Sequence, residues 1–290
     1  MEAVLQALVN GLIFGSVLAI GAVGLTLTWG IVRLINVSHG ELLTTGAFSA
    51  YLVNVTLGLP LILAFPAGAL VAIGVALIVE TILWRPLRRR QFGETQLMLI
   101  SIGLALALRN TIAFFWGADY RLLDVDRNQA YVVAGINISL LQIIVVVTSG
   151  AVLFALGYLL LATQTGRLLR AIASNRVLAE VAGVHTERMI RVAWVLAAGS
   201  AGIAGVLVSV LSVVEPNTGA FLLLSLFAAA VVGGLGDPIG TLAAAIVLGV
   251  VQSLSTLVLN PSYQAAVGFL VMIIVLIVRP RGIFGRATQG

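Results

Sequence analysis

The chain has 290 residues, of which 60% are hydrophobic and only 9% are charged, and its formal net charge is +5. Soluble domains usually contain about 25% charged residues, so this chain has too few charges to cover a water-facing surface. A soluble globular protein is therefore excluded. Apolar runs of about 20 residues, each long enough to cross a bilayer as a helix, recur along the whole length and predict an integral membrane protein.

Several kinds of protein chemistry lack the residues that they need. The chain has no cysteine, and all 16 basic residues are arginine. Thiolate chemistry, a Schiff-base lysine and a phosphate-binding loop, which requires a lysine, are therefore excluded. With two histidines and eleven scattered acidic residues, we expect neither a metal site nor a cofactor. The pI is near 10.4, but the arginines are spread over short loops, so we expect no nucleic-acid binding.

Nine segments are apolar enough to be membrane spans. In chain order they cover residues 4–30, 41–57, 61–84, 96–116, 139–162, 192–213, 220–235, 239–259 and 263–278. The run at 220–235 is short, and GGLGDPIG at 233–240 suits a re-entrant turn. The stretch at 35–57 begins with polar residues and suits a broken helix. We therefore predict an all-α polytopic membrane protein with eight or nine transmembrane helices, some broken or re-entrant.

The arginines predict how the chain is oriented. Thirteen of them lie at Arg33, in the loop 85–94, in the block 164–191 and in the tail after residue 278. Because short cytoplasmic loops are enriched in basic residues, these segments are expected in the cytoplasm. Nine crossings then place the N-terminus outside and the C-terminus inside. The first residues lack a basic stretch and continue into the first span, so we expect no cleaved signal peptide.

Few ionisable residues lie inside the predicted spans. Glu80 lies near the cytoplasmic end of its span, and Arg109 lies in the outer half of another. Arg109 has two possible roles: it binds a substrate carboxylate, or it reaches outward or pairs within the protein, as such arginines more often do. Proton-coupled carriers keep several ionisable groups inside their spans. The sequence instead suits a passive conduit that takes its energy from a partner.

Glycines and other small residues are spaced for close helix packing. In lipid, helices associate through such residues because their backbones can approach closely. The pairs and stripes are formed by Gly11 and Gly15, Gly199, Gly202 and Gly205, and Gly236 and Gly240.

One charged block, QTGRLLRAIASNRVLAEVAGVHTERMIR at 164–191, lies between two long apolar stretches. Ser174 or Asn175 suits the N-cap of a short helix that runs to about Ala182, and Gly183 can adopt the left-handed conformation that ends it.

The chain then returns to the membrane. Thr186 suits the N-cap of the next helix, with Glu187 in its first turn and Arg191 spaced to pair with Glu187. A solvated loop would not need this order of caps and stops, whereas an element that docks onto a partner would.

Four segments resemble the LivH-type permeases, which are membrane subunits of ABC importers for branched-chain amino acids. The segments are GLIFGSVLAIGAVGLTLTWGIVRLINVSHGELLTTGAF, GRLLRAIASNRVLAEVAGV, GGLGDPIGTLAAAIVLGVVQSL and RPRGIFGR, in the family's order over about residues 4–286. One departure is local, because the family pattern has phenylalanine or alanine where this chain has Val37 and Ser38. Related permeases carry urea, short amides or other amino acids.

The resemblance implies a permease subunit in the cytoplasmic (inner) membrane, with residues 1–290 forming a single transmembrane permease domain. It also implies a second, LivM-like permease or a second copy of this chain, two ATP-binding subunits and an extracytoplasmic binding protein. Segment 164–191 would couple to the ATPases, and this chain would not itself be an enzyme. The matching coupling residues are Gly166, Arg167, Arg170, Ala171, Asn175, Glu180 and Gly183.

A polar run at the start of the second span has two possible roles. It consists of Asn36, Ser38, His39, Gly40, Thr44 and Thr45. These residues either cap and satisfy a broken helix, or line the inner gate of a translocation path. The backbone amides near Gly40 could also face a carboxylate.

Three alternatives to an amino-acid importer remain open on the sequence. A urea or short-amide importer would share the same features, because pore contacts can be apolar or made by backbone. A stand-alone channel or facilitator would need no ordered docking helix. An intramembrane enzyme is weakly supported, because Ser38 and His39 are sequence neighbours and point to different faces of a helix.

Overall fold

The computed structural model describes residues 2–127, 129–133, 135–280, 282 and 283. Long helices dominate it: α1 (Glu2–Val32), α5 (Glu94–Trp116), α6 (Leu140–Ala162), α9 (Thr186–Leu211) and α11 (Pro238–Ser255). The shorter helices are α2 (His39–Tyr51), α3 (Ala64–Val79), α4 (Arg85–Arg89), α7 (Gln164–Ser174), α8 (Arg176–Val181), α10 (Thr218–Gly233) and α12 (Gln264–Val278).

Irregular turns extend several of these helices. π-helical turns continue α2 over Leu52–Thr56 and join α3 to α4 over Glu80–Trp84. Short 3₁₀ turns precede α3 at Leu61–Leu63 and α12 at Pro261–Tyr263. An antiparallel hairpin of β1 (Ala130–Val133) and β2 (Ile136–Ser139) is the one sheet in the described residues.

Each of the nine predicted spans corresponds to a helix, and the prediction of an all-α polytopic membrane protein is confirmed. Among the described residues, seven helices are long and apolar enough to cross a membrane, and α10 is a shorter apolar helix. With 16 residues, α10 is about 24 Å long, less than the roughly 30 Å of a hydrocarbon core. The predicted break is also present, since the chain leaves helical geometry between Val32 and His39, where Arg33 has a φ of 56°.

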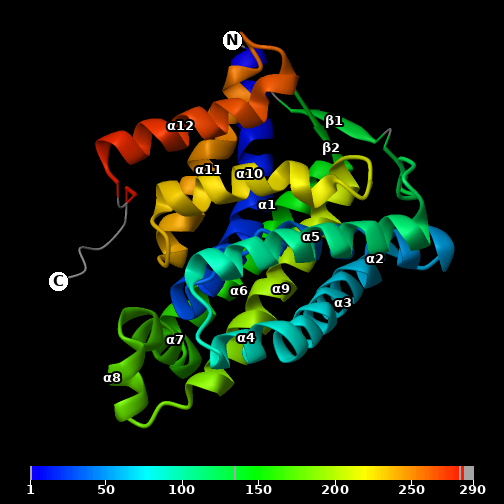
Figure 1. Ribbon diagram of the computed structural model, residues 1–290. Helices are drawn as coiled ribbons and strands as arrows, with labels where there is room; N and C mark the ends of the chain where they lie inside the picture. The colour runs from blue at the N-terminus through cyan, green and yellow to red at the C-terminus, as the bar shows by residue number, and fades with distance from the viewer. Residues whose placement is uncertain (1, 128, 134, 281, 284–290) are drawn as a thin grey trace.

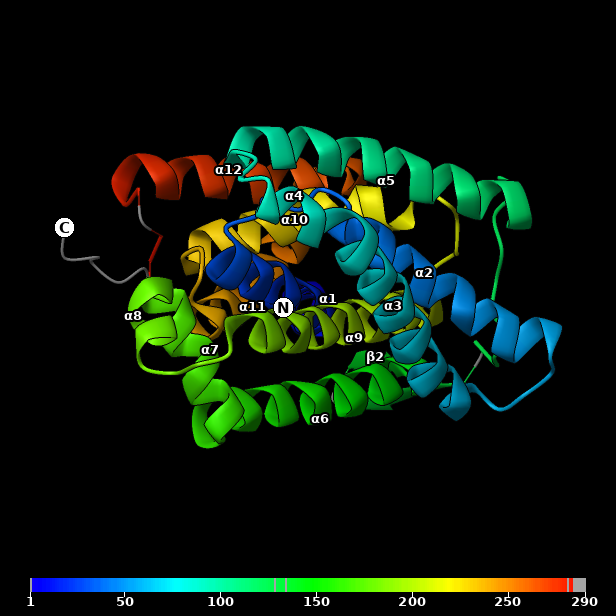
Figure 2. The same ribbon diagram turned by 60° about the horizontal axis from the view of Figure 1, so that its bottom comes forward.

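Helices α1 and α9 form the centre of the molecule. In their most apolar windows 67% and 72% of residues are buried, against 6% for the helix that ends at Val278. Figure 2 shows α1, α9 and α11 in the middle, with α5 and α12 along one edge and α6 along the opposite one. In Figure 1, α5, α10 and α12 cross α1 steeply instead of running beside it. Because α1 is apolar on all sides, its side chains must be covered by other helices or by lipid.

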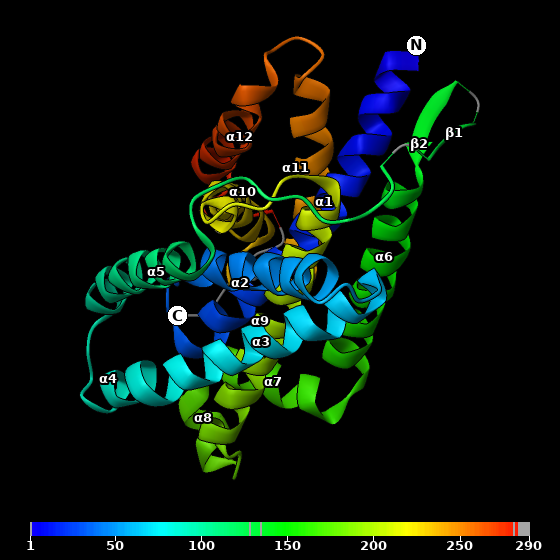
Figure 3. The ribbon, with the colours of Figure 1, turned by 90° about the vertical axis from the view of Figure 1, so that its right-hand side faces the viewer.

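The two ends of the molecule differ in character. The N-terminus of α1 and the β1–β2 hairpin lie at one end, while α4, α7 and α8 gather at the other (Figure 1 and Figure 3). The arginine-rich helix α4 and the charged block that contains α7 and α8 therefore lie at the same end, although they are far apart in the sequence.

Small residues let the central helices touch backbone to backbone. A Cβ atom placed on Gly46 of α2 would lie only 2.7 Å from the Cα of Gly202 in α9, and one on Gly11 of α1 would lie 2.7 Å from the Cα of Val250 in α11. A Cβ on Gly205 would collide with the carbonyl oxygen of Leu43. The packing role predicted for Gly11, Gly15, Gly202 and Gly205 is therefore confirmed, because each faces the backbone of a neighbouring helix.

The predicted pair of Gly236 and Gly240 is wrong as a helix-packing motif. Gly234 and Gly236 have φ values of 103° and 91° and form a tight turn between α10 and α11, which excludes a helical stripe. Asp237 caps α11 by accepting hydrogen bonds from the backbone N–H groups of Ile239 at 3.0 Å and Gly240 at 3.1 Å.

Gly46→Ala tests the close crossing of α2 and α9. Inserting a methyl group against the Gly202 backbone should destabilise the protein by about 1–3 kcal/mol, the usual effect of overpacking. The thermal unfolding midpoint in detergent measures this. The matched control is Gly74→Ala on α3, where a Cβ meets nothing within 4 Å. A Gly46→Ala protein that unfolds at the same temperature as the control would contradict the crossing.

Candidate functional site

The predicted polar run lies where the chain turns from α1 into α2. Asn36, Ser38, His39, Gly40 and Thr44 are buried, and Thr45 is half-buried. The hydroxyl of Ser38 donates to Oδ1 of Asn36 at 2.6 Å, and Ser38 occupies the N-cap position of α2.

The polar residues along α2 bond mainly to backbone. Nε2 of His39 lies 2.9 Å from the carbonyl oxygen of Gly21 in α1, which ties the start of α2 to the central helix. The hydroxyl of Thr45 donates to the carbonyl oxygen of Glu41 at 2.7 Å. The Thr45 hydroxyl is therefore satisfied without a ligand, whereas the buried Nδ1 of His39 has no hydrogen-bond partner among the described residues.

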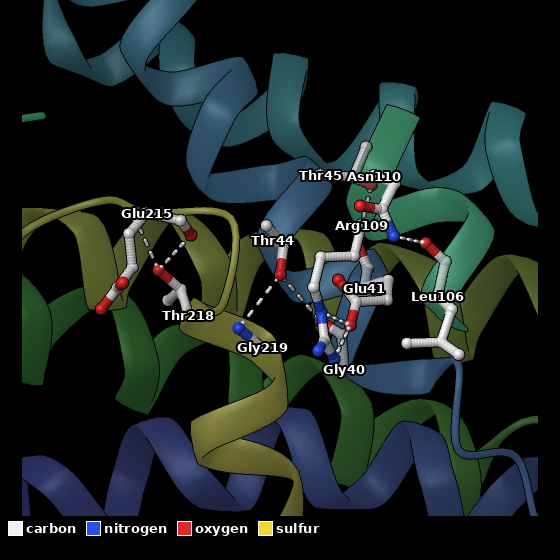
Figure 4. Close-up of polar contacts among 10 residues, drawn as sticks. All are labelled: Gly40, Glu41, Thr44, Thr45, Leu106, Arg109, Asn110, Glu215, Thr218 and Gly219. Carbon is white, nitrogen blue, oxygen red and sulfur yellow. Dashed lines mark hydrogen bonds and ion pairs between the residues drawn. The ribbon is translucent and has the colours of Figure 1, made fainter. Parts of the chain in front are cut away.

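Helix α10 begins against α2. The backbone N–H of Gly219 donates to Oγ1 of Thr44 at 3.0 Å, as Figure 4 shows. A Cβ on Gly40 would lie 2.6 Å from the carbonyl oxygen of Gly219, so the two helices cross with their backbones in contact. Thr44 therefore satisfies a first-turn donor of α10 that the helix itself leaves unpaired. Sequence reasoning missed this role for Gly219, because nothing local marks the two segments as neighbours.

A buried ion pair joins α2 to α5. Both Nη2 and Nε of Arg109 donate to Oε1 of Glu41, at 2.8 and 3.2 Å (Figure 4). The Glu41 side chain is 1% exposed and that of Arg109 is 26% exposed. The pairing expected for Arg109 within the protein is confirmed. Its partner Glu41 was missed, because it lies 68 residues away in the sequence and reads as the first residue of a span.

A second ion pair joins the π-helical turn that follows α3 to α4. The guanidinium of Arg88 pairs with the carboxylate of Glu80, whose side chain is 3% exposed. The π-helical backbone places these two residues, eight apart in the sequence, within reach of each other.

Two tryptophans stack beside a small cavity, and one of them, Trp84, directly precedes α4. The rings of Trp84 and Trp194 are parallel within 4°, with centroids 6.5 Å apart. Both border the cavity, as do Asn36 and Ser38, and its apolar wall comprises Leu42, Ala76, Val79, Leu104 and Leu108. The cavity has room for about one water molecule.

The charged block folds as two helices, α7 and α8. Thr163 caps α7 by accepting a bond from the backbone N–H of Gly166 at 3.2 Å. Gly166, in the first turn of α7, lies so close to the end of α6 that a Cβ there would collide with the carbonyl oxygens of Leu159 and Leu160. Sequence reasoning did not identify α7 as a separate helix.

The predicted cap and stop of the short helix are confirmed. Oδ1 of Asn175 accepts from the backbone N–H of Leu178 at 2.9 Å, which makes Asn175 the N-cap of α8. Helix α8 ends at Val181 with Ala182 as its C-cap, and Gly183 follows with a φ of 86°.

Two details of the next helix were predicted wrongly. His185, not Thr186, occupies the N-cap of α9, and the Thr186 hydroxyl donates instead to Oε1 of Glu180 at 2.8 Å. Glu187 pairs with Arg85 of α4 at 3.4 Å and not with Arg191. In both cases the side chain bonds to a residue outside α9, and the predicted interaction within α9 does not form.

The outer surface of α8 carries apolar side chains. Val177, Leu178 and Val181 are 71%, 65% and 81% exposed. Glu180 lies among them, and hydrogen bonds from Thr186 and then Arg176 lower the pKa of its carboxyl group. Of the remaining predicted coupling residues on α7, Arg167, Arg170 and Ala171 are exposed. Exposed apolar residues on a helix outside the spans indicate a surface that a partner covers.

Within the described part of the chain, no group of three or more histidine or acidic residues could hold a metal ion.

Comparison with known proteins gives a match along almost the whole chain. The model of the family described as branched-chain amino acid transport system / permease component matches residues 7–276. The chain is 31% identical to the high-affinity branched-chain amino acid transport system permease proteins BraD of Pseudomonas aeruginosa and LivH of Escherichia coli, over 97% of this chain and 96% of each relative. It is 28% identical to the ribose import permease protein RbsC of Escherichia coli, over 91% of this chain and 82% of that protein. No solved structure gives a significant match.

Arg109→Leu tests the buried pair between α2 and α5. Removing one partner leaves the Glu41 carboxylate buried without a counter-charge, which should destabilise the protein by about 3 kcal/mol. The unfolding midpoint in detergent reports the loss, and adding Glu41→Gln should recover most of it. Arg176→Leu, which breaks an exposed pair with Glu180, is the control and should change stability by at most about 1 kcal/mol. Equal effects of Arg109→Leu and Arg176→Leu would show that the buried pair is not structural.

Proposed function

Because the chain belongs to the family of branched-chain amino acid transport permeases, we propose that it is the transmembrane permease subunit of an ABC importer. It moves branched-chain or other apolar amino acids across the cytoplasmic membrane by alternating access. The observation that carries this proposal is the match of 31% identity over 97% of the chain to permeases named for these substrates. The weaker match to a ribose permease indicates that one architecture serves more than one substrate class.

The energy for transport comes from other subunits in this proposal. The chain has no lysine and so lacks the phosphate-binding loop of an ATPase. Its buried acids Glu41 and Glu80 are each paired with an arginine, which argues against a proton-coupled carrier. Two ATP-binding subunits, a second permease of the same kind and an extracytoplasmic binding protein complete the importer.

The proposed orientation has the N-terminus outside and the C-terminus in the cytoplasm. Supporting it, the arginine-rich helix α4 lies at the same end of the molecule as α7 and α8, and the N-terminus of α1 lies at the opposite end (Figure 1). Basic segments gathered at one end fit the enrichment of arginine in cytoplasmic loops.

We infer that segment 164–191, with α7 and α8, is the coupling segment onto which an ATPase subunit docks. The exposed Val177, Leu178 and Val181 supply its apolar contact, and Arg167 and Arg170 supply charge beside it. Gly166, Asn175 and Gly183 position these helices through a close approach, a cap and a left-handed stop.

We propose that only Asn36 and Ser38 of the polar run belong to the translocation path. Asn36 and Ser38 border the cavity near the cytoplasmic end, which favours a place in the path. His39, Gly40 and Thr44 bond or pack against α1 and α10, and Thr45 bonds within α2, which favours a role in holding the helices.

Uptake by the complete importer tests the proposed function. Liposomes that contain this chain, its partner permease, the two ATPase subunits and the binding protein should take up labelled leucine only with ATP. Excess isoleucine or valine should compete, and ribose or urea should not. This chain alone should show neither leucine flux nor ATP hydrolysis above an empty-liposome background. Competition by ribose or urea instead of valine would show that the proposed substrate class is wrong. Leucine flux through the chain alone would indicate a facilitator.

Gly183→Val tests the coupling segment. A β-branched residue at a φ of 86° is strained, while a Cβ there meets nothing within 4 Å, so the effect is on backbone conformation and not on packing. We expect the importer to assemble but leucine uptake, and the ATPase activity linked to it, to fall about tenfold, within the usual range of coupling between sites. Gly183→Asn, which tolerates this conformation better, should retain most of the uptake. Normal uptake by Gly183→Val would mean that the stop is dispensable for coupling.

A further inference from the structure

The chain that follows α12 folds back onto the end of α10. The backbone N–H of Gly282 donates to the carbonyl oxygen of Arg279 at 2.9 Å, which closes a turn directly after α12. The backbone N–H of Ile283 then donates to the carbonyl oxygen of Val232 at 2.8 Å. Val232 lies in the last turn of α10, where a helix leaves its own carbonyl groups unpaired. The tail therefore satisfies part of the end of α10.

Gly282 makes this contact possible. Its φ of 80° lies in the left-handed region that favours glycine. A Cβ atom there would lie only 2.6 Å from the carbonyl oxygen of Val231 and 2.7 Å from the backbone nitrogen of Gly234. The glycine of the tail sequence RPRGIFGR thus holds the end of the chain against the turn between α10 and α11.

A second cavity, of about 100 Å³, lies beside this contact, and every residue that borders it is apolar. Its wall is formed by α1, the irregular segment after α1, α10 and the turn before α11, through residues that include Leu25, Trp29, Leu34, Phe227, Val231 and Leu235. Leu235 is 41% exposed and marks the rim. Because Val231 belongs to the wall and also meets Gly282, the tail reaches the edge of the cavity.

Charged residues flank the rim of this cavity. Arg33, which directly precedes Leu34, is exposed, and the carboxylate of Asp237, two residues after Leu235, caps α11. Charged side chains are costly in the hydrocarbon core of a bilayer, from which a lipid acyl chain would enter. The rim therefore suits a segment of protein at the membrane surface better than it suits lipid.

We propose that this cavity receives the side chain of Phe284, the residue that follows Ile283. Residues 284–290 lie outside the described part of the chain, and Phe284 is the one bulky apolar residue in their sequence, FGRATQG. Consecutive Cα atoms are about 3.8 Å apart, so the bond from Ile283 to Val232 keeps Phe284 near the cavity wall. A phenyl ring suits a cavity of this size, since an apolar cavity of about 150 Å³ in another protein takes up benzene.

The docked ring ties the two ends of the chain together. On α1 it faces Leu25 and Trp29, and on α10 it faces Phe227 and Val231. One side chain of the tail then holds the first helix against a helix of the C-terminal half. This role is separate from transport and does not depend on the proposed function.

Because the chain has no cysteine, one introduced at the rim tests the proposal in lipid nanodiscs, where both membrane faces are accessible. A membrane-impermeant maleimide should label Leu235→Cys slowly while Phe284 covers it. Burial of a phenylalanine side chain is worth at least about tenfold in an equilibrium, so adding Phe284→Ser should raise the labelling rate about tenfold or more. Phe284→Leu keeps an apolar side chain and should raise the rate much less. Ending the chain after Ile283 should act like Phe284→Ser.

A cross-link measures proximity while Phe284 stays in place. A short bis-maleimide should join Leu235→Cys to Gly285→Cys, and Phe284→Ser should slow this reaction. The matched control is Val258→Cys in the connection between α11 and α12, which is 86% exposed and lies at the end that holds the N-terminus (Figure 1). It should be labelled at one rate in every tail variant and should not be joined to Gly285→Cys.

Two results would overturn the proposal. One is labelling of Leu235→Cys in the otherwise unchanged chain that is as fast as labelling of Val258→Cys. The other is slow labelling that neither Phe284→Ser nor truncation after Ile283 changes, which would mean that another occupant, such as an acyl chain, covers the rim. Neither measurement needs ATP or partner subunits, so failure of the proposed function would leave both outcomes unaltered.

Discussion

The close crossing of α9 with α2 and α3 is the contact on which the rest of the structure depends. Lipid tails are as apolar as leucine, so helices in a membrane gain little from apolar burial and associate through close packing instead. Gly46 and Gly68 meet α9 at Gly202, and the Leu43 carbonyl meets it at Gly205. This crossing sets the position of α2, and α2 in turn supplies Glu41 to Arg109 and Thr44 to the start of α10.

The ionisable groups in the interior serve architecture more than chemistry. Glu41 with Arg109 attaches the otherwise exposed helix α5, and Glu80 with Arg88 lies at the π-helical turn before α4. A buried ion pair adds little net stability, but a single partner left behind is strongly unfavourable. The two pairs therefore hold their helices in one register.

Helix α9 connects the proposed coupling segment to the central helices. It begins directly after α7 and α8, stacks Trp194 on Trp84 and, about two to three turns later, packs Gly202 and Gly205 against α2 and α3. In the proposed importer, a displacement of the coupling segment would act on a helix whose second half is packed into the core.

Features that depend only on neighbouring residues in the chain could be predicted from the sequence. Long apolar runs predict the spans, the polar run predicts the break before His39, and Asn175 with Gly183 predicts the cap and stop of α8. Each signal is local, because a membrane span needs only length and apolar character, and a cap needs only side chains within one turn.

Contacts between residues far apart in the chain became known from the folded structure alone. Glu41 lies 68 residues from Arg109, and Glu187 pairs with Arg85 on another helix instead of with Arg191 one turn away. Thr186 resembles a cap in the sequence, yet its hydroxyl bonds to Glu180 because α8 folds back beside it. Such pairings depend on how helices cross, and the spacing of residues along one helix carries no information about which other helix will lie against it.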